Sequence, residues 1–235
     1  MPDPILSLKK LDAFYGDFQA LYGVDMEMAE GEVIAIIGAN GAGKSTLLRS
    51  ISGLMSNEID QVNFLGKGIG AHRTDEIAAL GLALVPEGRQ LFPSLSVEEN
   101  LLIGGRLNRK GPWDLQSVFD LFPVLKERRA YPSTALSGGQ QQMVAIGRAL
   151  MANPDLILFD EISLGLAPVT IKSIYDALPG IVGDGMSAII VEQDISKALL
   201  VSDRVYCLME GRVTLEGAAD SISREAISHA YFGID

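Results

Sequence analysis

A buried strand that runs directly into a glycine-rich loop and then a helix constrains the fold more than any other feature of this sequence. Residues 31–45 read GEVIAIIGANGAGKS, where a continuous apolar run gives way to closely spaced glycines. Continuous apolar runs are typical of parallel strands that are covered on both faces. Similar runs, each bounded by glycine, proline or charge, occur at residues 81–87, 154–161, 186–193 and 204–211. The sequence therefore predicts an α/β fold with a parallel sheet in a three-layer arrangement.

Helical and antiparallel segments surround these predicted strands. In residues 44–55 the side chains Leu47, Leu48, Ile51 and Leu54 fall on one face of a helix. Ser96 stands three residues before Glu99, which is the spacing of a capping box at a helix start. Residues 92–147 contain much helical pattern and no convincing strand, so we expect a helical insertion there. The near-alternation of apolar residues before residue 32 predicts an antiparallel ribbon.

The loop after the first strand has the composition of a phosphate-binding loop. GANGAGKS fits G-x-x-x-x-G-K-[ST], between a strand and a helix. Glycines let the backbone wrap closely around phosphate oxygens, and a helix N-terminus attracts the anion. Lys44 would supply charge to the β- and γ-phosphates, and Ser45 would offer its hydroxyl to Mg²⁺. The predicted nucleotide-binding residues are Gly38, Ala39, Asn40, Gly41, Ala42, Gly43, Lys44, Ser45 and Thr46.

Two carboxylates follow the predicted strand LILFDE at residues 156–161. Asp160 would hold Mg²⁺ through water, and Glu161 would orient or deprotonate the attacking water. The alternative is that the two acids merely make a strand end soluble. The phosphate-binding loop in the same chain argues against this alternative. We therefore predict that Glu161 is a catalytic residue.

Charge and composition exclude several classes of function. The formal net charge is −11 and lysines and arginines form no cluster, so we expect no nucleic-acid partner. The single cysteine, Cys207, lies in an apolar run and fits a reducing compartment. The first residues have no export-signal pattern, and no apolar run approaches the ~18 residues that span a bilayer. Any link to a membrane would then go through another protein.

The segment LSGGQQQ at residues 136–142 resembles the signature of the ABC-type ATPases. This resemblance covers nearly the whole chain. It implies a single ABC ATPase domain over 1–235 with a P-loop NTPase (RecA-like) core at about 33–91 and 148–215. An N-terminal antiparallel β subdomain would lie at about 3–32 and 60–70, a helical subdomain at 92–147 and a helical tail at 216–235.

The same resemblance assigns roles to further residues. Tyr15 matches the aromatic residue that stacks on adenine, although it could instead pack within the ribbon. The signature residues would contact the ATP bound by an opposite subunit, so that two chains sandwich each ATP. These signature residues are Ser137, Gly138, Gly139 and Gln140.

The chain more closely resembles the F-type ATP-binding subunits of branched-chain amino acid importers. The residues that carry this likeness lie at 84–101, 160–168, 189–195 and 229–235. It implies an ATPase that works with a sister ATPase, membrane-spanning permease subunits and, indirectly, a periplasmic binding protein. The chain would then lie in the cytoplasm, peripheral on the inner face of the cell membrane. The identity of the transported solute rests on this resemblance alone, and relatives that transport amides, urea or aromatic acids would have similar sequences.

Several positions depart from the broad ABC pattern. Glu87 stands where most relatives have a glutamine, but its carboxylate could still join Ser45 and Asp160 as a metal ligand. Ile162 replaces a proline, and the segment SLGLAP lacks the usual aspartate. Gln193 replaces a histidine that contacts the γ-phosphate. We predict that Gln193 is catalytic and donates a hydrogen bond there with weaker charge stabilisation; alternatively it simply ends the strand in solvent.

These departures leave a second function open. The chain could be a regulatory half of a heterodimeric ABC ATPase that binds ATP but hydrolyses it weakly or not at all. Retention of Lys44, Ser45, Asp160 and Glu161 argues against this alternative.

Overall fold

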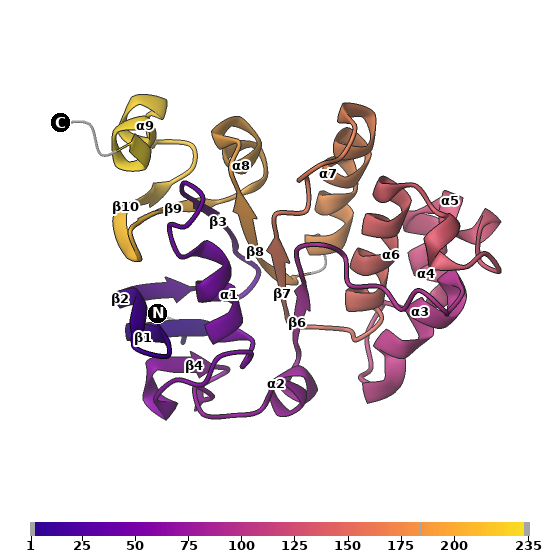
Figure 1. Ribbon diagram of the computed structural model, residues 1–235, viewed down its shortest axis with the longest axis horizontal. Helices are drawn as coiled ribbons and strands as arrows, with labels where there is room; N and C mark the ends of the chain where they lie inside the picture. Colours follow the sequence, from indigo (N-terminus) through magenta and orange to yellow (C-terminus); the bar gives the residue numbers. More distant parts are fainter. Residues whose placement is uncertain (1–2, 184, 233–235) are drawn as a thin grey trace.

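A six-stranded sheet forms the centre of the molecule, in the order β10-β9-β3-β8-β7-β6 (Figure 1). The computed structural model describes residues 3–183 and 185–232. Neighbouring strands from β9 to β6 pair in parallel, and β10 pairs antiparallel with β9. The strands are β3 (Val33–Ile37), β6 (Leu82–Val85), β7 (Leu156–Asp160), β8 (Ser187–Glu192), β9 (Arg204–Met209) and β10 (Arg212–Ala218). The parallel α/β core that the apolar runs predicted is confirmed.

The sheet is buried on both faces because successive side chains of its strands enter different clusters. Ile34 and Ile36 of β3 pack with helix α1 (Lys44–Ile51) and the antiparallel strands, whereas Ala35 and Ile37 face helices α8 (Ile195–Val201) and α9 (Arg224–Phe232). Further along the sheet, Phe159 packs with the cluster around α6 (Gly138–Leu150) and α7 (Pro168–Val182). The helices of the core are α1 (Lys44–Ile51), α2 (Thr74–Leu80), α7 (Pro168–Val182), α8 (Ile195–Val201) and α9 (Arg224–Phe232). This double coverage explains the continuous apolar runs.

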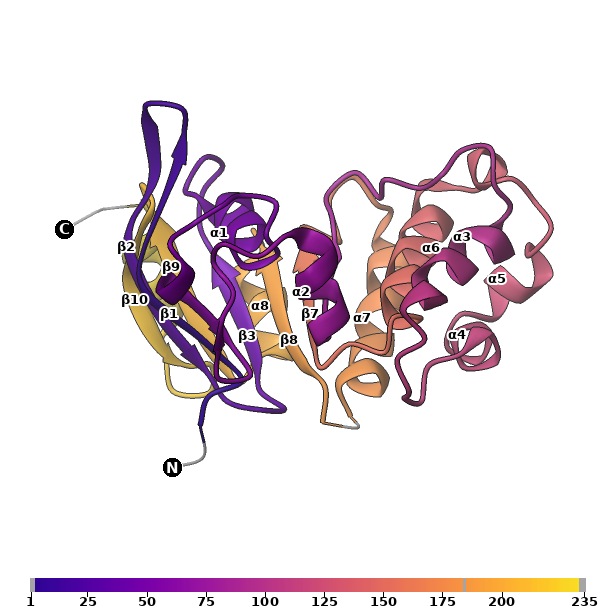
Figure 2. The same ribbon diagram turned by 90° about the horizontal axis from the view of Figure 1, so that it is seen from below.

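A second, four-stranded antiparallel sheet has the order β2-β1-β4-β5. Its strands are β1 (Leu6–Tyr15), β2 (Phe18–Met28), β4 (Val62–Phe64) and β5 (Lys67–Gly68), with a 3₁₀ turn η1 (Ile59–Gln61) before β4. It packs against α1 and one face of the core sheet. The helical part lies at the opposite end of the molecule from this sheet (Figure 2).

The helical part consists of four helices and two 3₁₀ turns. They are α3 (Val97–Gly104), η2 (Gly105–Leu107), α4 (Leu115–Leu121), α5 (Pro123–Glu127), η3 (Ser133–Ala135) and α6 (Gly138–Leu150). The predicted capping box is present, because Ser96 Oγ accepts from the Glu99 amide and Glu99 Oε2 accepts from the Ser96 amide. Arg109 fastens this part to the core by donating to Asp155 Oδ2 at 2.6 Å and to the Ala79 carbonyl at 3.1 Å.

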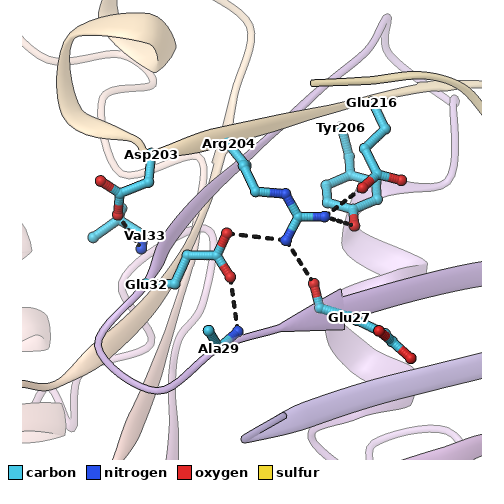
Figure 3. A network of polar contacts seen from close by, with 8 residues as sticks. All are labelled: Glu27, Ala29, Glu32, Val33, Asp203, Arg204, Tyr206 and Glu216. Carbon is cyan, nitrogen blue, oxygen red and sulfur yellow. Dashed lines mark hydrogen bonds and ion pairs between the residues drawn. The ribbon is translucent and has the colours of Figure 1, made fainter. Parts of the chain in front are cut away.

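A network of polar contacts around Arg204 fixes the two sheets together (Figure 3). The Arg204 guanidinium donates to Glu32 Oε1 at 3.0 Å and to the Glu27 carbonyl at 3.0 Å. It also donates to the Tyr206 hydroxyl at 2.6 Å and to the Glu216 carboxylate. Burial raises the pKa of Tyr206 to about 12, so its hydroxyl keeps its proton at neutral pH. One side chain thereby connects β2, the start of β3, β9 and β10.

The structure differs from the sequence-based expectation at three element ends. The helix expected over residues 44–55 ends at Ile51, because Gly53 turns the chain with φ +72°, and Leu54 is 56% exposed rather than on a buried face. The strand expected within residues 186–193 ends at Glu192, whose side chain is buried, and leaves Gln193 outside it. Strand β10 reaches Ala218, past residue 216 where we expected the helical tail to begin. Residues 233–235 of that tail lie outside the described residues, and the subdomain boundaries stay predictions.

No helix in the described part of the chain is both long enough and apolar enough to cross a membrane.

Candidate functional site

The carboxyl ends of four parallel strands meet along one edge of a cavity of about 790 Å³. Glu87 follows β6, Asn40 follows β3, Glu161 follows β7 and Gln193 follows β8, and all four line this cavity. Ligands of open α/β sheets bind at this edge, where the loops after parallel strands come together. The fold thus gathers residues that lie up to 153 positions apart in the sequence.

The loop of residues 38–45 has a backbone that only glycine adopts readily. Gly41 and Gly43 have φ values of +82° and +105°, in the left-handed region. A Cβ atom at Gly38 would lie 2.4 Å from the Leu208 carbonyl oxygen, so the loop passes too close to β9 for any side chain there. The glycines that the sequence analysis selected are therefore required by geometry.

Helix α1 begins without a side-chain cap. Its N-cap, Gly43, makes no capping hydrogen bond, whereas Ser96, Asp114, Ser137 and Asp194 cap the helices that follow them. The first amides of a helix lack partners within the helix and favour an anion. The N-terminus of α1 faces the cavity, because Gly43, Lys44, Ser45 and Thr46 line it. A phosphate group would fit this position without displacing a side-chain cap.

The Lys44 ammonium is held over the loop in a buried position. Its Nζ donates to the carbonyl oxygens of Gly38 at 2.8 Å and Ala39 at 3.0 Å, and it lies 3.4 Å from Glu161 Oε1. The Lys44 side chain is 4% exposed and that of Glu161 is 11% exposed. The positive charge is therefore fixed at the centre of the loop and is partly neutralised by a carboxylate of the same chain.

Ser45 and Asp160 supply oxygen atoms next to each other. Ser45 Oγ donates to Asp160 Oδ1 at 3.0 Å. Burial raises the pKa of the Asp160 carboxyl above its ordinary value, and the nearby charges of Glu161 and Glu87 raise it further. Hydroxyl and carboxylate oxygens are the ligands that Mg²⁺ prefers, and two protein ligands with phosphate oxygens complete the usual site.

These donors fit Mg²⁺ together with a phosphate-bearing ligand. Within residues 3–183 and 185–232, no cluster of three or more His, Cys, Asp or Glu side chains could hold a metal ion unaided. The assignment of Ser45, Glu87 and Asp160 as metal ligands stays a prediction.

Gln193 contacts two residues of the site and does not simply face solvent. Its Nε2 donates to Glu161 Oε2 at 2.8 Å and to Asn40 Oδ1 at 3.0 Å. Glu161 itself has φ +49°, a conformation that a residue with a side chain adopts at a cost. Its amide donates to the Val191 carbonyl at 3.2 Å, which ties this turn to β8. Glu161 is thus held at a defined place beside the loop.

Three of the described aromatic residues also line the cavity. Tyr15, at the end of β1, is 45% exposed, and its hydroxyl is 3.3 Å from Thr46 Oγ1. Phe18 and Tyr22 of β2 line the same cavity, together with Gln19. Tyr15 was predicted from the sequence as a nucleotide-binding residue, whereas the cavity-lining residues of β2 were not. Their aromatic character was visible in the sequence, but only the pairing of β1 with β2 brings them beside Tyr15.

The four signature residues lie apart from the phosphate loop of the same chain. Ser137 caps α6 by accepting from the Gln140 amide at 3.3 Å, as its sequence position allowed. A Cβ atom at Gly139 would lie 2.1 Å from Thr170 Cγ2, so this glycine allows α6 to approach α7 closely. None of Ser137, Gly138, Gly139 and Gln140 is among the described residues that line the cavity.

Comparison with known proteins fits this geometry. The sequence profile of the ABC transporter family matches residues 21–163. The chain belongs to the ABC transporter family. A high-affinity branched-chain amino acid transport ATP-binding protein, BraG of Pseudomonas aeruginosa, is 40% identical over 97% of this chain and 100% of its own length. LivF of Archaeoglobus fulgidus, a probable branched-chain amino acid transport ATP-binding protein, is 33% identical over 93% of this chain and 94% of its own length.

Solved ABC structures share the fold. A nucleotide-free ATP-binding cassette from an ABC transporter superposes with a TM-score of 0.81 at 29% identity, covering 97% of this chain and 94% of its own. The ATP-binding cassette MJ0796, in a dimeric post-hydrolysis state with ADP and phosphate, gives a TM-score of 0.82 at 27% identity. That alignment covers 92% of this chain and 100% of the cassette. The present chain is an ABC-type ATPase.

Proposed function

We propose that this ABC ATPase is the ATP-binding subunit of an importer for branched-chain or other hydrophobic amino acids. The observation that carries the proposal is the similarity to BraG, which extends over 97% of this chain and the full length of that protein. We further propose that the chain works beside a sister ATPase on the inner face of the cell membrane, bound to membrane-spanning permease subunits. A periplasmic binding protein would deliver the solute to them.

ATP would bind with its phosphates on the loop of residues 38–45. The amides of Gly41 and Gly43 and the uncapped start of α1 would hold phosphate oxygens. Lys44 would keep its place over the loop and exchange its contact with Glu161 for contacts with the β- and γ-phosphates. The base would lie toward Tyr15, whose exposed ring supports stacking.

Glu161 would act on the water that attacks the γ-phosphate. When Mg²⁺ is bound through Ser45 and Asp160, with Glu87 nearby, it would neutralise charge on the phosphates. Glu161 would orient this water and accept its proton. Gln193 would hold Glu161 through its 2.8 Å hydrogen bond. Its second N–H would leave Asn40 Oδ1 and donate to the γ-phosphate.

The signature residues support the proposal of a dimer. Ser137, Gly138, Gly139 and Gln140 do not line the described chain's own cavity, so any role in ATP binding would require a second subunit. A nucleotide that contacts the loop of one subunit and the signature of another would favour the closed pair, because these contacts exist only in that state. Loss of the γ-phosphate would remove them and let the subunits separate.

The Glu161→Gln variant tests the reaction. We expect it to bind ATP in the assembled complex and to release phosphate at least ~100-fold more slowly, because the amide cannot accept the proton. Glu127→Gln is the matched control, since it removes the same charge from an exposed helix end. Rapid phosphate release by Glu161→Gln would remove Glu161 from the catalytic role.

Uptake measurements test the solute. In cells that lack the chromosomal copy, the wild-type chain should restore uptake of radiolabelled leucine, isoleucine and valine, and Glu161→Gln should not. Restored uptake of urea, an amide or an aromatic acid instead would assign a different solute to the same machinery.

The regulatory alternative rests on Glu87, Ile162 and Gln193, which depart from the broad ABC pattern. A regulatory subunit would bind ATP without turning it over in its own site. Single-turnover hydrolysis with the partner ATPase separates the two proposals, because only a catalytic site loses its activity when Glu161 is replaced.

A further inference from the structure

A buried tyrosine–glutamate pair lies directly behind the proposed catalytic residues. Tyr175 of α7 donates its hydroxyl hydrogen bond to Glu192 Oε1, at the end of β8. The two residues are 8% and 2% exposed. In the described part of the chain Glu192 has no ion-pair partner, although a buried carboxylate without a cation costs stability. A buried ionisable group of this kind is a candidate for a functional role together with the residues that it contacts.

Each member of the pair adjoins one of the proposed catalytic residues. Glu192 directly precedes Gln193, and its Oε2 accepts from the Gln193 amide at 3.2 Å. Ser163, two residues after Glu161, lies near enough to the Tyr175 hydroxyl to lower its pKa, against the larger effects of burial and Glu192. The Gln193 side chain in turn donates to Glu161 Oε2 at 2.8 Å. One buried hydroxyl therefore bonds the segment that carries Gln193 and lies near the segment that follows Glu161.

The pair is also fixed relative to the phosphate loop. Glu192 pairs with Ile37 across the junction of β8 and β3, and Ile37 immediately precedes Gly38. Burial and the Glu192 charge raise the pKa of Tyr175 well above its ordinary value, so the hydroxyl stays a donor at physiological pH. The direction of the bond, from tyrosine to carboxylate, is thus constant.

We propose that Tyr175 and Glu192 are positioning residues that hold Gln193 and Glu161 in the geometry needed for attack on the γ-phosphate. The inference rests on the proposed roles of Glu161 and Gln193 in ATP hydrolysis. Tyr175 acts from α7, and it connects these two residues to the segment 162–167 that leads into this helix. Neither Tyr175 nor Glu192 is among the described residues that line the cavity, so both would act through the residues that do.

The principal test uses Tyr175→Phe, which removes one oxygen atom and keeps the ring. In the complex that copurifies with the tagged full chain, we expect kcat to fall about tenfold, equivalent to the loss of one positioning hydrogen bond, while KM for ATP changes less than twofold. ATP affinity measured by calorimetry in the Glu161→Gln background should also change less than twofold. Tyr206→Phe is the matched control, because it removes the hydroxyl of another buried tyrosine that does not line the cavity and should leave kcat within twofold.

A double-mutant cycle distinguishes positioning from a general structural role. If Tyr175 acts through Gln193, adding Tyr175→Phe to Gln193→Ala should lower kcat less than twofold further. Glu192→Asp, which keeps the charge but withdraws the carboxylate from Tyr175, is the second variant and should also lower kcat. The inference would be overturned if Tyr175→Phe and Glu192→Asp both kept the wild-type kcat. It would also be overturned if the kcat of the double variant fell by the product of the decreases caused by Tyr175→Phe and Gln193→Ala separately. Failure of the wild-type complex to hydrolyse ATP would instead refute the proposed function, and the inference with it.

Discussion

Replacing Arg204 by methionine should destabilise the protein by about 3 kcal/mol. The side chain of Arg204 is 28% exposed and that of its partner Glu32 is 11% exposed, so their 3.0 Å contact is a largely protected ion pair. A charge-assisted hydrogen bond of this kind contributes about 1.5 kcal/mol. The bonds to the Glu27 carbonyl and the Tyr206 hydroxyl add about 0.5–1 kcal/mol each. The contact with Glu216, which is 48% exposed, adds at most about 0.5 kcal/mol after allowance for solvent screening.

Thermal unfolding followed by circular dichroism measures this loss. For a chain of this size, each kcal/mol shifts Tm by about 2–4 °C, so Arg204→Met should melt roughly 6–12 °C below the wild type. Methionine retains most of the apolar stem, so the effect reports on the guanidinium contacts. Arg73→Met is the control, because the Arg73–Asp75 pair is 76% and 64% exposed and should matter little. A Tm for Arg204→Met within 2 °C of the wild type would show that the network does not hold the two sheets together.

Three further predictions concern the site. Lys44→Met should weaken ATP binding about 30-fold or more in calorimetry, since a charge-assisted phosphate contact contributes about 2 kcal/mol; a change below threefold would contradict this. Asp160→Asn should raise the Tm of the nucleotide-free protein at pH 7.5. The pKa of Asp160 is raised in the folded state, so the ionised carboxylate costs stability above that pKa. The Tm advantage of the variant should therefore shrink as the pH falls toward the ordinary carboxyl range. Gln193→His should increase steady-state ATP hydrolysis in the assembled complex several-fold, because histidine adds a partial positive charge near the γ-phosphate; unchanged turnover would show that glutamine is no handicap.

The phosphate loop was predictable because its determinants are contiguous. Gly38, Gly41, Gly43 and Lys44 act within eight residues, between a strand and a helix that the apolar pattern also indicates. The conformation of such a loop depends mainly on local backbone freedom, which glycine spacing reveals directly. The parallel core was predictable for a similar reason, since burial on both faces leaves continuous apolar runs in the sequence.

Contacts between distant segments were not predictable. No role could be assigned to Glu192 from the sequence, because nothing near it in the sequence could shield a carboxylate. Its partner, Tyr175, is on a helix and has the ordinary pattern of a core residue. The Arg204 network likewise joins residues up to 177 positions apart. Such pairs become visible only when the fold has brought their elements together.

The contact between Lys44 and Glu161 has a consequence for the choice of ligand. Without nucleotide, the site supplies its own counter-charge at 3.4 Å from the ammonium. An incoming molecule must replace that carboxylate with oxygen atoms of its own and must also tolerate its repulsion afterwards. A phosphate group, with several anionic oxygens, meets this demand. Binding at the loop therefore exchanges one counter-charge for another and does not neutralise a bare ammonium.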